Sequence, residues 1–406
     1  MNDFTTRLVE KLLNQSDNSE LFSNALKELI RLEVEDGVNT ALKAEIDGFL
    51  GYEKYEHDDS GNYRNGTRTR TINTVYGEIN VQIPRDRNSL FHTCLLPQRK
   101  SYDAEIADTI KSLFDIGLTN SDIVKAVEKV YGASYSRQTV SNITDTLISR
   151  IDKFKKRTLA AQYAVIYIDG TNIALRRDTV QKEMVHIALG VRTDGTKEIL
   201  GYAIAPSESK TIWCELLNDL KKRGINDVAL FCTDGLSGME EAIHERFPDA
   251  RIQRCFLHAE RNISARVRVS DRAEVLGEFK QIAHCRDKET AEEALDAFKS
   301  RWRAKYPKII DALDNNRNLL TFYDFPKEIW SSIYTTNMIE SYNKQLKRSF
   351  KKKEQFPTEI SEEKYLVSQF ESYNHTNLNR VHKGFGQCTD YWDVYFKKIS
   401  TAYGQK

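Results

Sequence analysis

Residues 163–171 read YAVIYIDGT, in which six apolar residues run directly into Asp169. A short apolar run rich in aromatic and β-branched residues predicts a buried strand. The same texture returns in residues 227–235, DVALFCTDG, which run into Asp234. An Asp-Gly pair after a strand is often only a turn, so each aspartate taken alone is weak evidence for a functional site.

The segment between the two aspartates predicts the rest of a sheet. Two strand-like runs, residues 184–191 and 198–205, flank an Asp-Gly hairpin signal at residues 194–195. A helix is expected over residues 209–223, with Gly224 as its C-terminal cap. Three antiparallel strands, a helix and a further strand are the element order of an α/β core that is RNase H-like. In such a core both aspartates lie at strand ends on the same edge of the sheet.

A third acidic residue, Glu340, stands in the stretch TTNMIESYNKQLKR, residues 335–348. Mg²⁺ prefers hard oxygen ligands, and phosphodiester chemistry is promoted by two such ions about 3.5–4 Å apart. We therefore expect Asp169, Asp234 and Glu340 to hold two Mg²⁺ or Mn²⁺ ions in one active site, with Asp169 bridging them. The alternative for Glu340 is structural, because Asn337 three residues earlier would complete a capping box.

Basic residues follow Glu340 on the same expected helix. Lys347 lies two turns further along the face of Glu340, where it could reach a phosphate beside the scissile bond. Lys344 and Arg348 are candidate DNA contacts beside it. The alternative is a solvated basic helix face.

Residues 67–84 predict a basic β-hairpin. Threonines alternate with apolar residues around a Tyr76-Gly77 turn, and the hairpin is expected to end at Pro84. Residues 62–101 hold seven basic and two acidic side chains, a balance suited to phosphate although the whole chain has a net charge of only +1. The candidate DNA contacts here are five arginines: Arg64, Arg68, Arg70, Arg85 and Arg87. A solvated hairpin with basic side chains is the alternative.

Three short helices are expected next, at residues 104–114, 121–131 and 136–148. Their spacing fits a helix-turn-helix whose recognition helix begins SRQTVSNIT. Arg, Gln and Asn make the bidentate contacts that distinguish guanine from adenine. The candidate base contacts are Arg137, Gln138, Ser141 and Asn142. A plain helical bundle fits the same periodicity.

The first 57 residues show the apolar spacing of two or three amphipathic helices but are too few for a core of their own. We expect them to pack on another domain or on a second copy in a homodimer. The N-terminus carries Asp3, Glu10 and Lys11 where a signal peptide would be apolar, and no run of about 18 apolar residues follows. The expected location is the cytoplasm, in association with the nucleoid. Six cysteines without a Cys-x-x-Cys pair favour neither disulfides nor a zinc ribbon.

Several long motifs, in order along nearly the whole chain, resemble those of one family. They are YRNGTRTR, YGEINVQIPRDR, YIDGT, DGTKEILG, ESKTIW, CTDGLSGMEEAI, FPDARIQRCFLHAERN and YTTNMIESYNKQLKR. The chain resembles the bacterial insertion-sequence DDE transposases related to the plant Mutator element. The resemblance implies binding to the element's terminal inverted repeats, metal-dependent strand cleavage and strand transfer, and a copy-out pathway through a circular intermediate as one possibility.

The resemblance also implies roles for individual residues. The family's acidic triad matches Asp169, Asp234 and Glu340, its Cys-x-x-His signature matches Cys255 and His258, and its basic residue after the glutamate matches Lys347. Independently of the family, residues 252–256 read as a fifth strand, which would place His258 near the active-site edge in reach of the scissile phosphate while Cys255 packs. Zinc is disfavoured at Cys255, because the nearest other candidate ligands, His284 and Cys285, are poorly spaced for it.

Together these expectations divide the chain into six segments. They are an N-terminal helical region (1–57), a basic hairpin (58–103), a helix-turn-helix domain (104–155), a first catalytic part (156–265), an α-helical insertion (266–327), and a second catalytic part with the Glu340 helix and a C-terminal tail (328–406). Two other functions remain open at this point: an RNase H-like junction-resolving nuclease, and a non-enzymatic helix-turn-helix regulator. Strand joining would separate a transposase from the nuclease, and metal-dependent nicking would separate both enzymes from the regulator.

Overall fold

The computed structural model describes residues 19–52, 61–96, 104–131, 135–176, 180–205, 209–235, 238–351 and 358–403. The chain forms two compact units, Met1–Leu147 and Ile148–Lys406, which are considered separately below. The expected helix content of residues 1–18 lies outside the described residues. No described helix is both long enough and apolar enough to cross a membrane.

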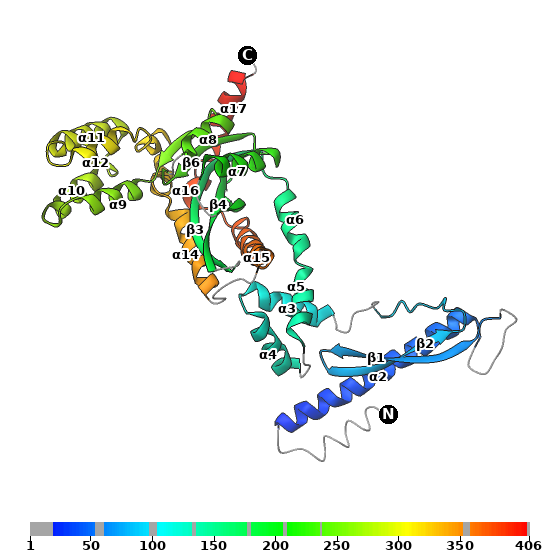
Figure 1. Ribbon diagram of the computed structural model, residues 1–406. Helices are drawn as coiled ribbons and strands as arrows, with labels where there is room; N and C mark the ends of the chain where they lie inside the picture. The colour runs from blue at the N-terminus through cyan, green and yellow to red at the C-terminus, as the bar shows by residue number, and fades with distance from the viewer. Residues whose placement is uncertain are drawn as a thin grey trace. The chain divides into compact units, whose positions relative to one another are not determined.

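In the first unit, a 32-residue helix, α2 (Ser19–Leu50), packs on a hairpin of β1 (Arg64–Thr74) and β2 (Gly77–Asp86) (Figure 1). Leu42 of the helix is buried together with Ile72, Ile79 and Val81 of the hairpin. Residues 19–50 form one continuous helix, since Val34, Val38, Leu42 and Ile46 continue one apolar stripe and no proline interrupts it. The apolar face of α2, which has too few residues to form a core of its own, is therefore covered by the hairpin of the same chain.

Side chains of α2 also cover the outer edge of β2. The backbone N–H groups of Asn80 and Gln82 donate to Glu35 and Asn39, at 3.0 and 2.7 Å. These N–H groups therefore point away from β1. Pro84 comes two residues after Gln82, so its backbone nitrogen also faces away from β1, and the missing N–H removes no hydrogen bond between the strands. This explains why β2 continues through Pro84 to Asp86, whereas the sequence suggested that it ends there.

Three helices complete the first unit: α3 (Ala104–Asp115), α4 (Asn120–Tyr131) and α5 (Arg137–Asp145). Each packs on the other two. Ser136 caps α5 by accepting from the backbone N–H of Thr139, as Ser/Thr N-caps do. The third helix ends at Asp145 rather than at residue 148, and the Thr146 hydroxyl bonds to the Ile143 carbonyl at this end.

The second unit is built on a five-stranded mixed sheet in the order β5-β4-β3-β6-β7. β3, β4 and β5 are antiparallel neighbours, and β6 and β7 run parallel to β3. This is the element order that the sequence predicts. The strands are β3 (Gln162–Arg176), β4 (Val180–Arg192), β5 (Lys197–Ala205), β6 (Asp227–Thr233) and β7 (Arg251–Arg254).

Helices cover both faces of this sheet. α7 (Lys210–Lys222) and α8 (Met239–Arg246) pack with Ile166, Ile168 and Phe231 in a core around Trp213. On the other face, α14 (Asn337–Lys351) packs on β3 and α15 (Glu359–Asn377) packs on β5. The remaining helices are α6 (Ile148–Lys156), α9 (Phe256–Arg266), α10 (Val269–Ile282), α11 (Lys288–Trp302), α12 (Pro307–Asp314), η1 (Thr321–Asp324), α13 (Lys327–Ile333), α16 (Lys383–Gly386) and α17 (Thr389–Tyr403).

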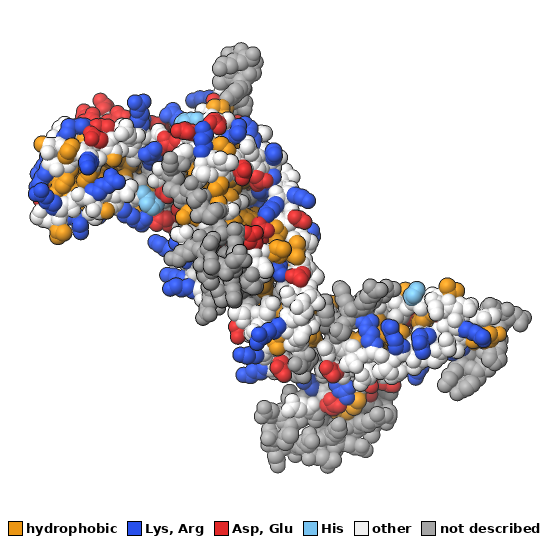
Figure 2. All heavy atoms as spheres, in the orientation of Figure 1, with side chains coloured by type: hydrophobic (Ala, Val, Ile, Leu, Met, Phe, Trp, Pro, Cys, Tyr) orange, Lys and Arg blue, Asp and Glu red, His pale blue; other side chains and the backbone are white. Residues whose placement is uncertain are grey.

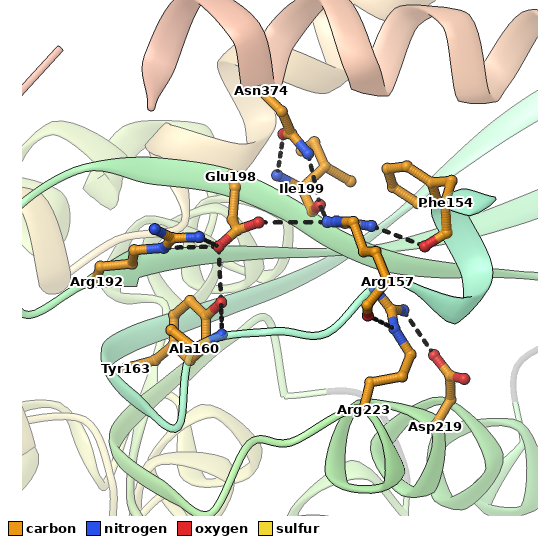
Figure 3. A network of polar contacts seen from close by, with 10 residues as sticks. All are labelled: Phe154, Arg157, Ala160, Tyr163, Arg192, Glu198, Ile199, Asp219, Arg223 and Asn374. Atoms are coloured by element: carbon orange, nitrogen blue, oxygen red, sulfur yellow. Dashed lines mark hydrogen bonds and ion pairs between the residues drawn. The ribbon is translucent and has the colours of Figure 1, made fainter. Parts of the chain in front are cut away.

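Helices α9 to α12 lie between β7 and the Glu340 helix in the sequence, and they form a helical lobe to one side of the sheet (Figure 1). Residues 266–327, where an α-helical insertion is expected, contain α10, α11, α12 and η1. Away from this lobe, a polar network centred on Glu198 ties α6 and α15 to the sheet (Figure 3). Glu198 is 2% exposed and meets Arg157, Arg192 and the hydroxyl of Tyr163.

Candidate active site

Asp169 and Asp234 lie at equivalent positions because β3 and β6 are parallel. Asp234 directly follows β6, but Asp169 is not at a strand end as the sequence predicted, because β3 stays paired with β4 and continues to Arg176. Tyr167 of β3 pairs with Cys232 of β6. Asp169 and Asp234 each follow by two residues, so they occupy equivalent positions on adjacent strands, where neighbouring strands lie about 4.8 Å apart. Two residues along a strand return a side chain to the same face, and Tyr167 and Cys232 both bond to backbone carbonyls of the segment that leads into α14. Both aspartates therefore belong to the α14 side of the sheet.

Glu340 lies in the first turn of α14. Its backbone N–H donates to the carbonyl of Thr336 at 2.9 Å, and the Thr336 hydroxyl donates to its carboxylate at 3.2 Å. Asn337 is the first residue of the helix rather than its cap, so the expected alternative of a capping box between Asn337 and Glu340 is not formed. Glu340 is 9% exposed, which fixes a nearly buried carboxylate close to the strand ends.

Asn343 links Glu340's helix to Asp169. Its side-chain amide donates to the Asp169 carboxylate at 2.8 Å, and the Gly170 N–H donates to the other carboxylate oxygen at 2.9 Å. Sequence reasoning missed Asn343, although its position three residues after Glu340 places it near the same helix face. Burial raises the pKa of Asp169, the bond from Asn343 opposes this, and the nearby charge of Glu340 raises it further. The cluster thus holds negative charge that is only partly compensated.

A basic group stands on the other side of Glu340. Arg261 of α9 donates to both Glu340 oxygens, at 3.4 and 3.2 Å, and its guanidinium lies 3.2 Å from His258 Nε2. Burial alone would raise the pKa of Glu340, but Arg261 lowers it below its ordinary value. Arg261 was not anticipated from the sequence; its place one helical turn after His258 was the available signal.

His258 lies where the sequence placed it, in the first turn of the helix after the fifth strand. Its pKa is raised, first by a hydrogen bond with the Cys255 thiol and further by the charges of Asp234 and Glu340. Cys255 is 2% exposed, and burial opposes its ionisation, yet the bonds from His258 and Thr336 lower its pKa. Electrostatic interactions thus connect His258 with all three acidic residues.

Two sets of residues at this edge could hold a metal ion. Cys255, His258 and Glu340 bring one ligand atom each within 4.8 Å of one another. Asp169, Asp234 and Glu340 instead offer only hard oxygen atoms, which suit Mg²⁺ or Mn²⁺. Glu340 belongs to both sets, so the Arg261 guanidinium bonded to it affects both equally.

The basic residues expected to contact DNA are placed unequally. Lys344, Lys347 and Arg348 are exposed on α14. Arg137, Gln138 and Asn142 are exposed on α5, Ser141 is half-buried, and the Gln138 amide donates to Asn142 at 2.9 Å.

In the hairpin, Arg64 is occupied within the unit by Asp47 and the Tyr52 carbonyl. Arg68, Arg85 and Arg87 are exposed and Arg70 is half-buried. Lys and Arg side chains gather along this hairpin (Figure 2).

The fold and this edge define an α/β protein with a carboxylate cluster beside a mixed sheet. The family model described as transposase, Mutator family, matches residues 4–379. The chain belongs to the Mutator family of transposases.

Curated relatives agree with this membership along the whole length. The chain is 44% identical to the transposase for insertion sequence element IS905 of Lactococcus lactis, covering 96% of this chain and 98% of the relative. It is 42% identical to the transposase for IS1201 of Lactobacillus helveticus, over 92% and 100% of the two chains. Among solved structures, a Drosophila P element transposase strand transfer complex aligns at 11% identity over 68% of this chain and 65% of that chain, with a TM-score of 0.28, too low to support a shared fold by itself.

Proposed function

We propose that this transposase cuts and joins DNA at Asp169, Asp234 and Glu340, in a core that is RNase H-like. The observation that carries the proposal is the meeting of the three residues. Asp169 lies within β3, Asp234 directly follows the parallel neighbour β6 in equivalent register, and Glu340 projects from the helix packed on β3. Burial raises the pKa of Asp169 and the charge of Glu340 raises it further, and a bound cation would offset both effects.

Asp169, Asp234 and Glu340 offer carboxylate oxygens that suit Mg²⁺ or Mn²⁺, and they would hold two such ions. When bound, such ions activate the attacking oxygen and stabilise the leaving oxygen of the phosphodiester. Asn343 orients the Asp169 carboxylate through its amide. His258 and the exposed Lys347 would contact phosphate oxygens beside the scissile bond, where a raised pKa favours the charged imidazolium.

DNA-end recognition is proposed for the first unit. The exposed arginines of the hairpin would contact phosphates, and α5, as the recognition helix of a helix-turn-helix, would present Arg137, Gln138 and Asn142 to base edges. Lys344 and Arg348 would add phosphate contacts beside the active site. The expected substrates are duplex DNA carrying the element's terminal inverted repeats and target DNA. A homodimer is proposed because two ends must be joined. The apolar face of α2 is not an argument for a dimer, because the hairpin of the same unit covers it.

The carboxylates are tested by substitution in the full chain. Asp169→Asn, Asp234→Asn and Glu340→Gln should each reduce Mg²⁺-dependent end cleavage and joining roughly a thousandfold or more, because the ions supply several kcal/mol of transition-state stabilisation. Binding to end DNA in EDTA should stay near wild type. Asp296→Asn is the matched control, since the Asp296 side chain is 79% exposed in the helical lobe. Near-wild-type joining by any one of the three variants would remove that residue from the site.

A further inference from the structure

A large polar groove lies in the second unit between α14 and α15, closed at one end by the segment that follows α15. Fourteen of its 16 lining residues carry a hydroxyl, an amide or a basic group, and none is acidic. Acidic residues make up about one in seven of the chain, with 59 in 406, so a lining of this size would ordinarily include some. The side chains present are those that contact phosphate and sugar in protein–DNA complexes.

Three basic side chains gather at one end of the groove: Lys197 of β5, and Arg380 and His382 beyond α15. Gly195 fixes this end. It adopts φ +84°, its carbonyl accepts from the His382 N–H at 2.9 Å, and an added Cβ would stand 2.9 Å from the Gly386 nitrogen. The β4–β5 turn is therefore held against the segment that carries His382.

Lys197 and Arg380 repel one another, and His382 beside them is shifted towards its neutral form. Burial lowers the pKa of Lys197, and the charge of Arg380 lowers it further. Burial also lowers the pKa of His382, and both Lys197 and Arg380 add to this. Within the described part of the chain, no acidic side chain forms an ion pair with Lys197 or Arg380. A cluster of like charge kept without a counter-charge is unfavourable in the free protein and indicates an anionic partner.

Two packed tyrosines, Tyr342 and Tyr373, form part of the groove wall. Tyr342 is 5% exposed, and its hydroxyl is buried without a hydrogen-bond partner among the described residues. Its ring packs edge-on against Tyr373 at 4.7 Å, which holds it in place.

We propose that this groove binds the backbone of target DNA while the element ends occupy the active site. The groove and Glu340 share α14. Ser341 and Gln345 line the groove, and each comes one residue after a residue of the Glu340 face, which is about 100° around the helix. It therefore lies about one helix diameter, ~10 Å, from Glu340. Target DNA, in contrast to the ends, has no fixed sequence, and contacts from lysine, serine and amide groups to phosphate carry no sequence information. The inference rests on the proposed function of this site.

The test uses the full-length chain saturated with its own end duplexes in EDTA, and a labelled duplex of unrelated sequence. Lys197→Ala combined with Arg380→Ala should weaken binding of the unrelated duplex at least about tenfold and reduce the salt slope of log K by about two. Gln345→Glu, an exposed and nearly isosteric change, should also weaken it by placing a negative charge in the groove. In Mg²⁺, joining to a plasmid should fall at least tenfold relative to end cleavage.

The matched control is Lys222→Ala combined with Lys308→Ala, which removes two exposed charges elsewhere in the same unit. If the Lys222/Lys308 control weakened binding as much as the Lys197/Arg380 variant does, the groove would not be the binding site. The proposal would also be wrong if both groove variants left the salt slope of log K and the ratio of joining to cleavage unchanged. Equal loss of end duplex and unrelated duplex would assign the groove to the element ends and overturn its role in target binding. The binding measurement needs no catalysis, so joining that survives Asp169→Asn would refute the proposed active site and leave the groove standing.

Discussion

Glu198 and Asp169 are carboxylates in the same sheet, the first buried and the second half-buried, and their surroundings differ. Glu198 is surrounded by Arg157, Arg192 and the Tyr163 hydroxyl, which together match its charge and its hydrogen-bonding capacity (Figure 3). Asp169 has one amide and one backbone N–H, and its nearest charged neighbours include Glu340. A compensated carboxylate stabilises the fold, whereas an under-compensated one leaves a place for a cation.

The largest effect is expected when the charge of Glu198 is removed, which tests whether this paired carboxylate stabilises the fold. Glu198→Gln should lower the free energy of unfolding of the second unit by about 3 kcal/mol or more, because Arg157 and Arg192 lose their buried counter-charge. All four tryptophans, residues 213, 302, 330 and 392, belong to this unit, so tryptophan fluorescence in urea reports its unfolding alone.

Two controls sharpen this measurement. Glu371→Gln removes a half-exposed ion pair with Arg150 and should cost within about 1 kcal/mol. Asp169→Asn, at the under-compensated position, should not lower stability in metal-free buffer. If Asp169→Asn destabilised the unit as much as Glu198→Gln does, the distinction between the two carboxylates would be wrong.

A matched pair of buried asparagines tests the comparison at the next level. Asn343 bonds to Asp169, whereas Asn374 bonds to both backbone groups of Ile199, at 2.6 and 3.1 Å. Asn343→Ala should raise the Mg²⁺ concentration needed for half-maximal cleavage about 10–100-fold, because groups that orient metal ligands contribute on that scale. Asn374→Ala should leave that concentration unchanged and lower stability instead. A Mg²⁺ titration of cleavage for both variants decides, and equal Mg²⁺ dependence would count against Asn343 as a positioning residue.

The sequence predicted those parts of the molecule that depend on local pattern. Apolar runs and an Asp-Gly turn were enough for the strands and their order, because burial on both faces of a central sheet demands continuous apolar residues. The three acids were predicted from strand ends and one helix start. Asn343 and Arg261 were missed, since their partners lie 174 and 79 residues away; helical spacing from Glu340 and His258 marks their positions but not their partners.

The end of β2 shows a different limit. Proline is a reasonable signal for the end of a strand, but here the missing N–H would have faced α2, and only the strand register reveals this. The packing of α2 on the hairpin was likewise invisible in the helix alone, whose apolar stripe does not say what covers it. Long-range pairing, rather than local propensity, decides such cases.

The smallest effect is expected at Asp86, a buried carboxylate whose charge is stabilised by hydrogen bonds instead of by cationic side chains. Burial alone would raise its pKa, but bonds from the Asn62 amide and from the N–H groups of Phe91 and Leu90 lower it to about 2. The folded pKa lies below the unfolded value of 3.8, so this stabilisation is present above about pH 4 and is lost as the pH falls towards 2.

Asp86→Ala should therefore speed hydrogen exchange at Leu90 and Phe91 about tenfold at pH 6, on the scale of one charge-assisted hydrogen bond. Mass spectrometry of peptides from residues 61–96 measures this, with Asp86→Asn, which keeps an acceptor, expected to lie between. The difference from wild type should shrink as labelling is moved from pH 6 to pH 3, and a difference that stays constant or grows would mean that the Asp86 charge is not what the hydrogen bonds stabilise.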